Sequence, residues 1–67
     1  MLLKEYLDGL KAERPTWKAV VNVHGREVIR CDALKVDYDV VASNLLYAEV
    51  NLVCYDYPSQ TYYYYVD

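Results

Sequence analysis

The sequence predicts an α+β fold in which one N-terminal amphipathic helix packs on a small antiparallel β-sheet of three to four strands, in the order α-β-β-β-β. Three observations support this prediction: an apolar stripe with helical spacing at the start of the chain, two β-prone runs around a glycine, and two tyrosine-rich runs in the last third. The chain has 67 residues, 55% of them hydrophobic, and a net charge of −3. This composition is opposite to that of a disordered chain, so we expect a single domain over residues 1–67.

The helix is predicted from apolar residues that fall on one face while charged residues fall on the other. The apolar residues that recur at the spacing of one helical face are Leu2, Leu3, Tyr6, Leu7 and Leu10. Pro15 disfavours helical backbone at the residue before it, so the helix is predicted to cover about residues 2–13. Gly9 lowers the stability of this helix by about 0.5–1 kcal/mol relative to alanine, so we expect the helix to need a sheet to lie on.

The first pair of strands is predicted over residues 17–23 and 26–31, which are β-prone and flank the pair His24-Gly25. Gly25 supplies the positive φ that a tight hairpin turn requires. The sequence leaves open whether these two residues or a longer loop make the turn. The chain's one histidine is therefore predicted to be a turn residue and not a general base.

The segment at residues 32–46 connects the two halves of the predicted sheet. Residues 35–39 alternate between polar and apolar side chains, which predicts a short strand or extended backbone. Asp39 is a predicted N-cap for a short helical turn within residues 39–46.

The second hairpin is predicted over residues 49–66, with turn chemistry at Pro58, Ser59 and Gln60. A turn centred on Pro58-Ser59 gives a definite register because cross-strand partners are then equidistant from the centre. The predicted partners are Tyr55 with Tyr62, Val53 with Tyr64, Cys54 with Tyr63, and Leu52 with Tyr65.

Alternation gives this hairpin two faces, and a single helix can cover only one of them. We predict that the helix covers the face that carries Val50, Leu52, Cys54, Tyr63 and Tyr65. The other face then stays in water unless a partner binds it, and it carries Val53, Tyr55, Tyr57, Tyr62 and Tyr64. The alternative is an ordinary solvated face, because tyrosine tolerates both environments.

Charge is divided unevenly along the chain. Residues 1–35 hold all seven Lys and Arg with five acids, a net +2, whereas residues 36–67 hold five acids, no base and eight of the nine tyrosines. Tyrosine is enriched at the energetic centres of protein interfaces, and segregated charge selects partners of the opposite sign. We therefore predict a partner-binding surface of four tyrosines and three acids: Tyr55, Tyr57, Tyr62, Tyr64, Asp37, Asp39 and Asp56.

No enzyme, cofactor or metal site is predicted. The sequence has no glycine-rich phosphate loop and no HExxH motif, and exposed acids near a loop such as Asp37 and Asp39 are commonly solvated. Cys31 and Cys54 are too few for a four-thiolate metal site, and we expect both to be free, partly buried thiols in a reducing cytoplasm. No apolar run approaches the roughly 20 residues of a membrane span, and Met1 leads directly into a charged segment, so neither a span nor a signal peptide is expected.

Three runs carry a resemblance to known proteins: LLKEYL at residues 2–7, LLYAEV at residues 45–50 and YYYYV at residues 62–66. They resemble small proteins of bacteriophages and mobile elements of gut Firmicutes, which often pair one helix with a hairpin that ends in an aromatic strand. This resemblance implies a phage accessory role. Inhibitors of host defence, including anti-CRISPR proteins, are a recurrent kind among such small acidic proteins.

The expected function is therefore a non-enzymatic binding protein that blocks a host macromolecule, such as a nucleic-acid-handling defence protein, through its acidic tyrosine hairpin. Direct binding of nucleic acid is not expected because the anionic half would repel phosphates. Two alternatives stay open. One is a homo-oligomer that uses the tyrosine face as its own interface, and the other is a sponge for a small nucleotide-like ligand, whose phosphates would be held by Lys18, Arg26, Arg30 and Lys35.

Overall fold

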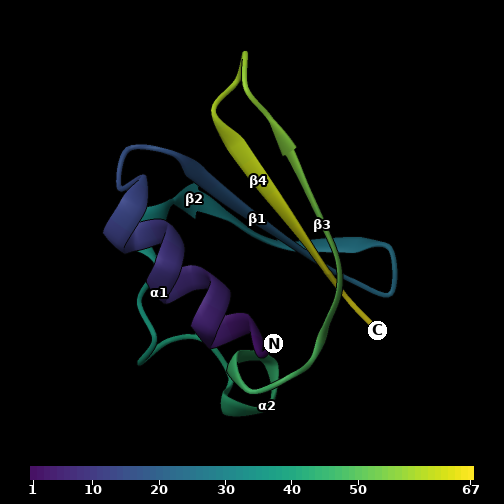
Figure 1. Cartoon of the computed structure of the whole chain (residues 1–67). Helices are drawn as coiled ribbons and strands as arrows, with labels where there is room; N and C mark the ends of the chain where they lie inside the picture. The colour runs from purple at the N-terminus through teal and green to yellow at the C-terminus, as the bar shows by residue number, and fades with distance from the viewer.

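A four-stranded sheet carries the long helix on one of its faces in the computed structural model of the protein, which describes residues 1–67 (Figure 1). The predicted α+β class, the N-terminal helix on the sheet and the short helical turn near residues 39–46 are confirmed. The elements in chain order are α1 (Leu3–Glu13), β1 (Lys18–Val23), β2 (Arg26–Asp32), the 3₁₀ helix η1 (Ala33–Lys35), α2 (Ser43–Leu46), β3 (Val50–Asp56) and β4 (Thr61–Val66).

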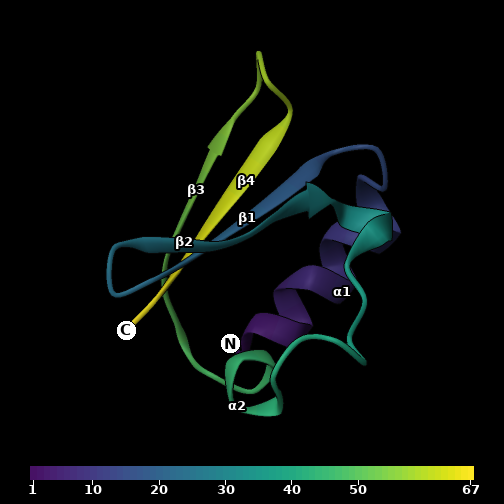
Figure 2. The ribbon, with the colours of Figure 1, turned by 180° about the vertical axis from the view of Figure 1, so that it is seen from behind.

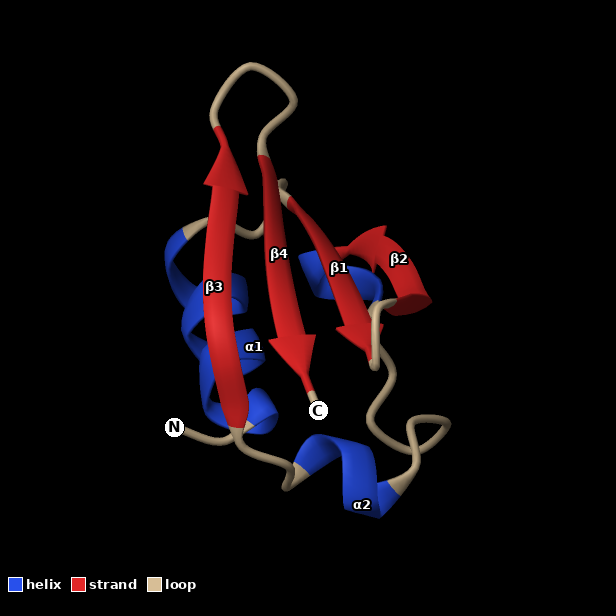
Figure 3. Cartoon of the chain, turned by 90° about the vertical axis from the view of Figure 1, so that its right-hand side faces the viewer, coloured by secondary structure: helices blue, strands red, loops and turns tan.

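The sheet is mixed, which differs from the antiparallel sheet that the sequence predicted. The strand order is β2-β1-β4-β3, and the two central strands β1 and β4 run parallel. Each hairpin is antiparallel within itself, but the long connection over residues 33–49 lets the second hairpin join the first with its last strand on the inside. Figure 3 shows β4 between β3 and β1, with α1 behind the sheet.

The β1–β2 turn consists of His24 and Gly25 alone, which settles the length that the sequence left open. Val23 pairs with Arg26, and the two residues between them have φ angles of 51° and 77°. Two successive positive φ angles are the signature of the type I′ turn, which matches the twist of the flanking strands. The backbone N–H of His24 also donates to the Val66 carbonyl at 3.1 Å.

The predicted register of the β3–β4 hairpin is confirmed for all four partner pairs. Tyr55 lies opposite Tyr62, and the pairs Val53–Tyr64, Cys54–Tyr63 and Leu52–Tyr65 follow in order. The register shifts between Val50 and Leu52, where Asn51 is an extra residue, so Val50 lies opposite Val66.

The predicted assignment of the hairpin faces is wrong, because α1 covers the opposite face. Tyr64 is 2% exposed and belongs to the core with the leucines of α1, whereas Leu52 is 56% exposed. The bulge at Asn51 turns Val50 to the same side as Val53, so Val50 does not share a face with Leu52 as the sequence pattern indicated. The face beneath α1 is completed by small residues of β1: Ala19 lies beside Tyr62, and Val21 lies beside Tyr64.

Residues 33–42 also differ from the prediction. The predicted strand over residues 35–39 is absent, and η1 and a turn take its place. Asp39 does not cap α2, since the N-cap is Ala42. The backbone N–H of Asp39 instead donates to the Asp37 carboxylate at 2.9 Å, which is a local turn contact.

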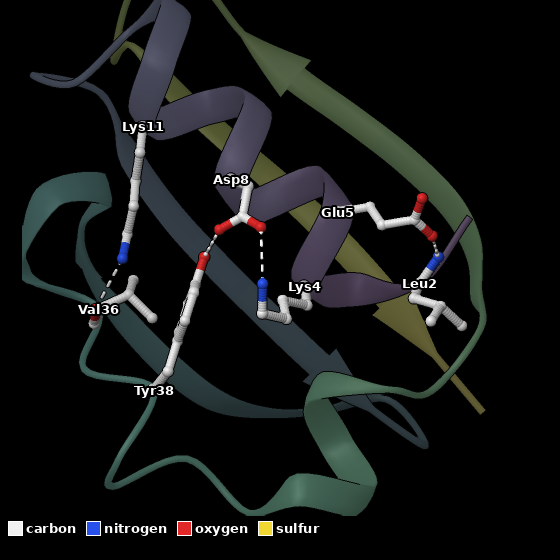
Figure 4. Close-up of polar contacts among 7 residues, drawn as sticks. All are labelled: Leu2, Lys4, Glu5, Asp8, Lys11, Val36 and Tyr38. Carbon is white, nitrogen blue, oxygen red and sulfur yellow. Dashed lines mark hydrogen bonds and ion pairs between the residues drawn. The ribbon is translucent and has the colours of Figure 1, made fainter.

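A polar latch holds this connection against α1 (Figure 4). The Tyr38 hydroxyl donates to the Asp8 carboxylate at 2.6 Å, and the Lys4 ammonium donates to the same group at 2.9 Å. The Lys11 ammonium lies 3.9 Å from the Tyr38 ring centroid and donates to the Val36 carbonyl at 3.0 Å. The Tyr38 hydrogen bond and then the Lys4 contact hold the pKa of Asp8 below its ordinary value of 3.8. Partial burial and the bond to Asp8 raise the pKa of Tyr38.

The burial of Tyr64 predicts a large difference between two neighbouring tyrosines. We expect Tyr64→Ala to lower the free energy of unfolding by about 3 kcal/mol or more, because it empties a site beneath α1. Tyr63→Ala, on the uncovered face, should cost far less. Urea unfolding followed by circular dichroism compares the two variants, and equal losses would contradict the observed face assignment.

The latch predicts a pH dependence of stability. Because the pKa of Asp8 is lower in the folded chain than in the unfolded one, its contribution is present above about pH 4 and is lost as the pH falls through the folded value. Asp8→Asn should therefore be less stable than the natural chain at neutral pH, and the difference should shrink toward about pH 2–3. Thermal unfolding at both pH values measures this. Asp39→Asn is the matched control, because the Asp39 carboxylate has no side-chain partner, and it should show no such difference.

Candidate binding surfaces at the hairpin end and beside the helix

Six aromatic rings form a continuous series of contacts from the middle of α1 to the loop of the β3–β4 hairpin. Neighbouring ring centroids are 5.0 to 6.0 Å apart, and most pairs are tilted or edge-to-face. These separations are the ones at which aromatic pairs attract one another beyond simple burial. Tyr6 contacts Tyr64, and Tyr64 contacts Tyr62. From Tyr62 the contacts divide to Trp17 and to Tyr55, and both of these rings contact Tyr57.

Arg14 and Trp17 are members of this cluster that the sequence analysis missed. The Arg14 guanidinium lies 4.4 Å from the Trp17 ring and 5.4 Å from the Tyr57 ring. Such placement over ring faces is a favourable cation–π arrangement. The nearby Tyr57 hydroxyl is the main cause that raises the pKa of Arg14. No pattern in the sequence signals this proximity, which arises because the parallel pairing of Lys18 with Thr61 brings the start of β1 beside the hairpin loop.

Exposure increases from the helix toward the hairpin loop. Tyr64 and Trp17 are buried, Tyr62 is half-buried, and Tyr55 and Tyr57 are each 56% exposed. The outer rings are thus supported from below by inner ones and present their free faces to solvent. We call the outer part of this cluster the aromatic tip, and it consists of Arg14, Trp17, Tyr55, Tyr57 and Tyr62.

The three predicted acids do not form one rim around this surface. Asp56 lies at the hairpin, where its carboxylate accepts hydrogen bonds from the Ser59 backbone N–H and hydroxyl at 3.3 and 2.5 Å. Asp37 and Asp39 lie in the connection after η1, which Figures 1 and 2 place far from the hairpin loop. The structure therefore brings together Tyr55, Tyr57, Tyr62 and Asp56, while Tyr64 lies under α1.

A groove with a volume of about 260 Å³ runs between α1 and the β3–β4 hairpin. Its floor is formed by Val53, Tyr62 and Tyr64, and one wall is a stripe of α1 residues spaced four apart: Glu5, Gly9 and Glu13. Met1, Tyr6, Leu10 and Arg14 complete the lining.

The Tyr64 side chain is buried except at its hydroxyl group. Its hydroxyl makes no hydrogen bond within the protein, and no buried side-chain polar atom is left without a partner. The hydroxyl therefore reaches solvent, and the groove is the hollow that Tyr64 lines. Burial raises the pKa of this hydroxyl, so it remains a neutral hydrogen-bonding group.

The sheet face opposite α1 is covered by no other element (Figure 3). Leu52 and Cys54 are exposed there, beside the half-buried Tyr63 and Tyr65. Cys54 was expected to be partly buried and is exposed, while Cys31 is half-buried as expected. On the same face, the Arg30 guanidinium binds both carboxylate oxygens of Glu27, at 2.7 and 3.0 Å.

Three further observations concern metal ligands, the charges near the groove and the length of the helices. No group of three or more His, Cys, Asp or Glu side chains is arranged to hold a metal ion. The four cations considered for a nucleotide-like ligand do not line the groove, whose nearest charges include two carboxylates. None of the helices combines the length and the apolar character that crossing a bilayer would need.

The comparisons with known proteins assign the chain to no family. No protein-family model, curated protein or solved structure matches the sequence or the fold.

Proposed function

We propose that this protein is a non-enzymatic binding module that engages a partner protein through its aromatic tip. The observation that carries the proposal is the position of the Arg14 guanidinium over the Trp17 and Tyr57 rings. Tyr57 and its neighbour Tyr55 are each more than half exposed. Trp, Tyr and Arg are the residue types that dominate the binding energy of protein interfaces. Because these side chains already support one another, little conformational entropy remains to be lost on binding.

The charge of the second half of the chain favours a basic partner. Residues 36–67 hold five acids and no base, and Asp56 is the one that lies in the β3–β4 hairpin near the tip. Opposite charge steers association and suppresses wrong partners. The partner we propose is a protein that handles nucleic acid, and the module would act by occupying its phosphate-binding surface. A host defence protein, blocked by a phage-type inhibitor, is the form of this proposal that agrees with the resemblance of the sequence.

Self-association is a second candidate function, and the uncovered sheet face favours it. Leu52 is 56% exposed beside Cys54 and two half-buried tyrosines, so this face could bury apolar surface against a second copy. Analytical ultracentrifugation over a range of concentrations tests it. If this candidate is correct, the natural chain shows a concentration-dependent mass and Leu52→Lys remains a monomer.

The aromatic tip predicts a specific loss of partner capture. We expect Tyr55→Ser combined with Tyr57→Ser to reduce capture at least tenfold, which corresponds to about 1.4 kcal/mol, while far-UV circular dichroism stays unchanged because both rings are exposed. Tyr47→Ser is the matched control, since Tyr47 is 59% exposed and lies after α2, away from the tip. Quantitative mass spectrometry of proteins retained from a bacterial lysate measures capture.

The same capture should weaken as salt rises from about 50 to 500 mM, because exposed charge pairs are screened at high ionic strength. Equal retention by the double variant and the Tyr47 control would refute a role for the tip. Retention that is insensitive to salt would refute the charge component and leave an apolar interface.

A further inference from the structure

The outer edge of β3 is an unpaired edge of the sheet. β3 is the last strand of the sheet, and its only neighbour along the hairpin is β4. At its beginning, Glu49 makes an isolated antiparallel bridge with Leu2, in which the Val50 N–H donates to the Met1 carbonyl at 3.1 Å. The edge thus already accepts one backbone partner at its start. No strand lies beside residues 51–56, and open edges of this kind bind extended chains.

The groove described above opens along this same edge. Its helical wall presents Glu5, Gly9 and Glu13 at intervals of four residues, which is about 6 Å along a helix axis. Alternate side chains of an extended strand are about 6.8 Å apart. The alternate side chains of a strand added to β3 would therefore face the three wall positions one after another. Figure 3 shows that α1 and β3 run in the same direction, with α1 behind the strand.

The two ends of this wall carry acidic side chains, and its middle residue, Gly9, has no side chain. Glu13 has no hydrogen bond or ion pair, and Glu5 uses one carboxylate oxygen to accept the Leu2 backbone N–H at 2.9 Å (Figure 4). At Gly9, an added Cβ would meet no atom within 4 Å. The floor opposite Gly9 is apolar and aromatic, formed by Val53 and the rings of Tyr62 and Tyr64.

Most of the neighbouring cations are engaged elsewhere. Lys4 is paired with Asp8, and Lys11 lies on the Tyr38 ring, both at the latch. The terminal ammonium of Met1 is paired with Glu49 at 3.3 Å. The Arg14 guanidinium lies over the Trp17 ring and makes no ion pair with Glu13, although the Glu13 charge contributes to the raised pKa of Arg14.

We propose that the β3 edge and this groove bind an extended segment of a partner protein with the pattern basic-x-apolar-x-basic. The segment adds a strand to β3, its two cationic side chains face Glu5 and Glu13, and its apolar side chain fills the space at Gly9. This inference rests on the proposed function only in that the partner is a protein. The groove shares Arg14 and Tyr62 with the aromatic tip, but Tyr55 and Tyr57 do not line it.

A second copy of the chain fits this edge poorly. Antiparallel pairing of two β3 strands about Val53 would add a strand that carries no Lys or Arg, so it would present no cation to Glu5 or Glu13. Asp56 of that strand would instead bring a further negative charge to this edge. A phosphate-bearing ligand is disfavoured because its negative charge would meet the carboxylates of Glu5 and Glu13.

The test uses the full-length chain labelled with ¹⁵N and an end-blocked peptide of sequence Thr-Lys-Thr-Val-Thr-Lys-Thr. We expect saturable chemical-shift changes at the backbone amides of Gly9 and residues 51–56, with a dissociation constant below about 1 mM. The same peptide with Glu in place of both Lys should not bind. Glu5→Gln combined with Glu13→Gln should weaken the Lys peptide at least tenfold and reduce its dependence on salt.

Gly9→Leu fills the groove, and we expect it to abolish binding of the peptide. It should also raise the unfolding temperature, since leucine favours helix more than glycine does and the site has room. Ala12→Leu is the matched control, because Ala12 is exposed on the same helix and does not line the groove, and it should bind as the natural chain does.

Absence of binding up to about 1 mM, equal binding of the Glu peptide, or unaltered binding by Gly9→Leu would each overturn the proposal. The variant with Tyr55→Ser and Tyr57→Ser separates the two hypotheses, because it should still bind the peptide. If it binds the peptide but captures lysate proteins as before, the tip fails and the groove stands. If peptide binding is absent but capture depends on these tyrosines, the groove fails and the tip stands.

Discussion

The ring of Tyr64 lies under α1 in the centre of the sheet, and this contact determines how the tyrosines are divided between core and surface. One helix can bury only one face of so small a sheet. Because side chains alternate along a strand, burial of Tyr64 commits Tyr62 to the helix side and leaves Tyr63 on the uncovered face. Tyr55 lies opposite Tyr62, and Tyr55 and Tyr57 are each 56% exposed, so the aromatic contacts of the core continue into rings that solvent reaches. The aromatic tip is in this sense the outer end of the hydrophobic core.

Local features of the fold could be predicted from the sequence because local chemistry determines them. Pro15 ends the helix, and the centre of the second turn fixes the partners of β3 and β4, so both predictions are confirmed. The choice of face failed because alternation and register determine which hairpin residues share a face, but not which of the two faces α1 covers. The bulge at Asn51 also reverses the side on which Val50 lies. No turn signal or change of period in the sequence marks that bulge. The residues in the hairpin were therefore paired correctly while the surface that they present was inverted.

Contacts between distant segments could not be predicted in the same way. Arg14 and Trp17 join the aromatic tip only because β1 and β4 are parallel neighbours, and a single sequence contains no record of which strand pairs with which. The path of the connection at residues 33–42 could not be predicted from the sequence either. Its place is set by Tyr38, whose hydroxyl binds Asp8 on α1. These are side-chain contacts over long sequence separations, so neither propensity nor periodicity predicts them.

Gly9 shows how the requirements of the helix and of the groove differ. A glycine in the middle of a helix costs about 0.5–1 kcal/mol relative to alanine, which is a sizeable share of the stability of a 67-residue domain. Close packing does not require this glycine, because a Cβ there would meet nothing within 4 Å, and its backbone has ordinary helical geometry. The one local consequence of the missing side chain is therefore an open space between α1 and the floor formed by Tyr62 and Tyr64. A side chain supplied by another molecule can occupy that space, with acidic groups on either side of it and an unpaired strand edge alongside.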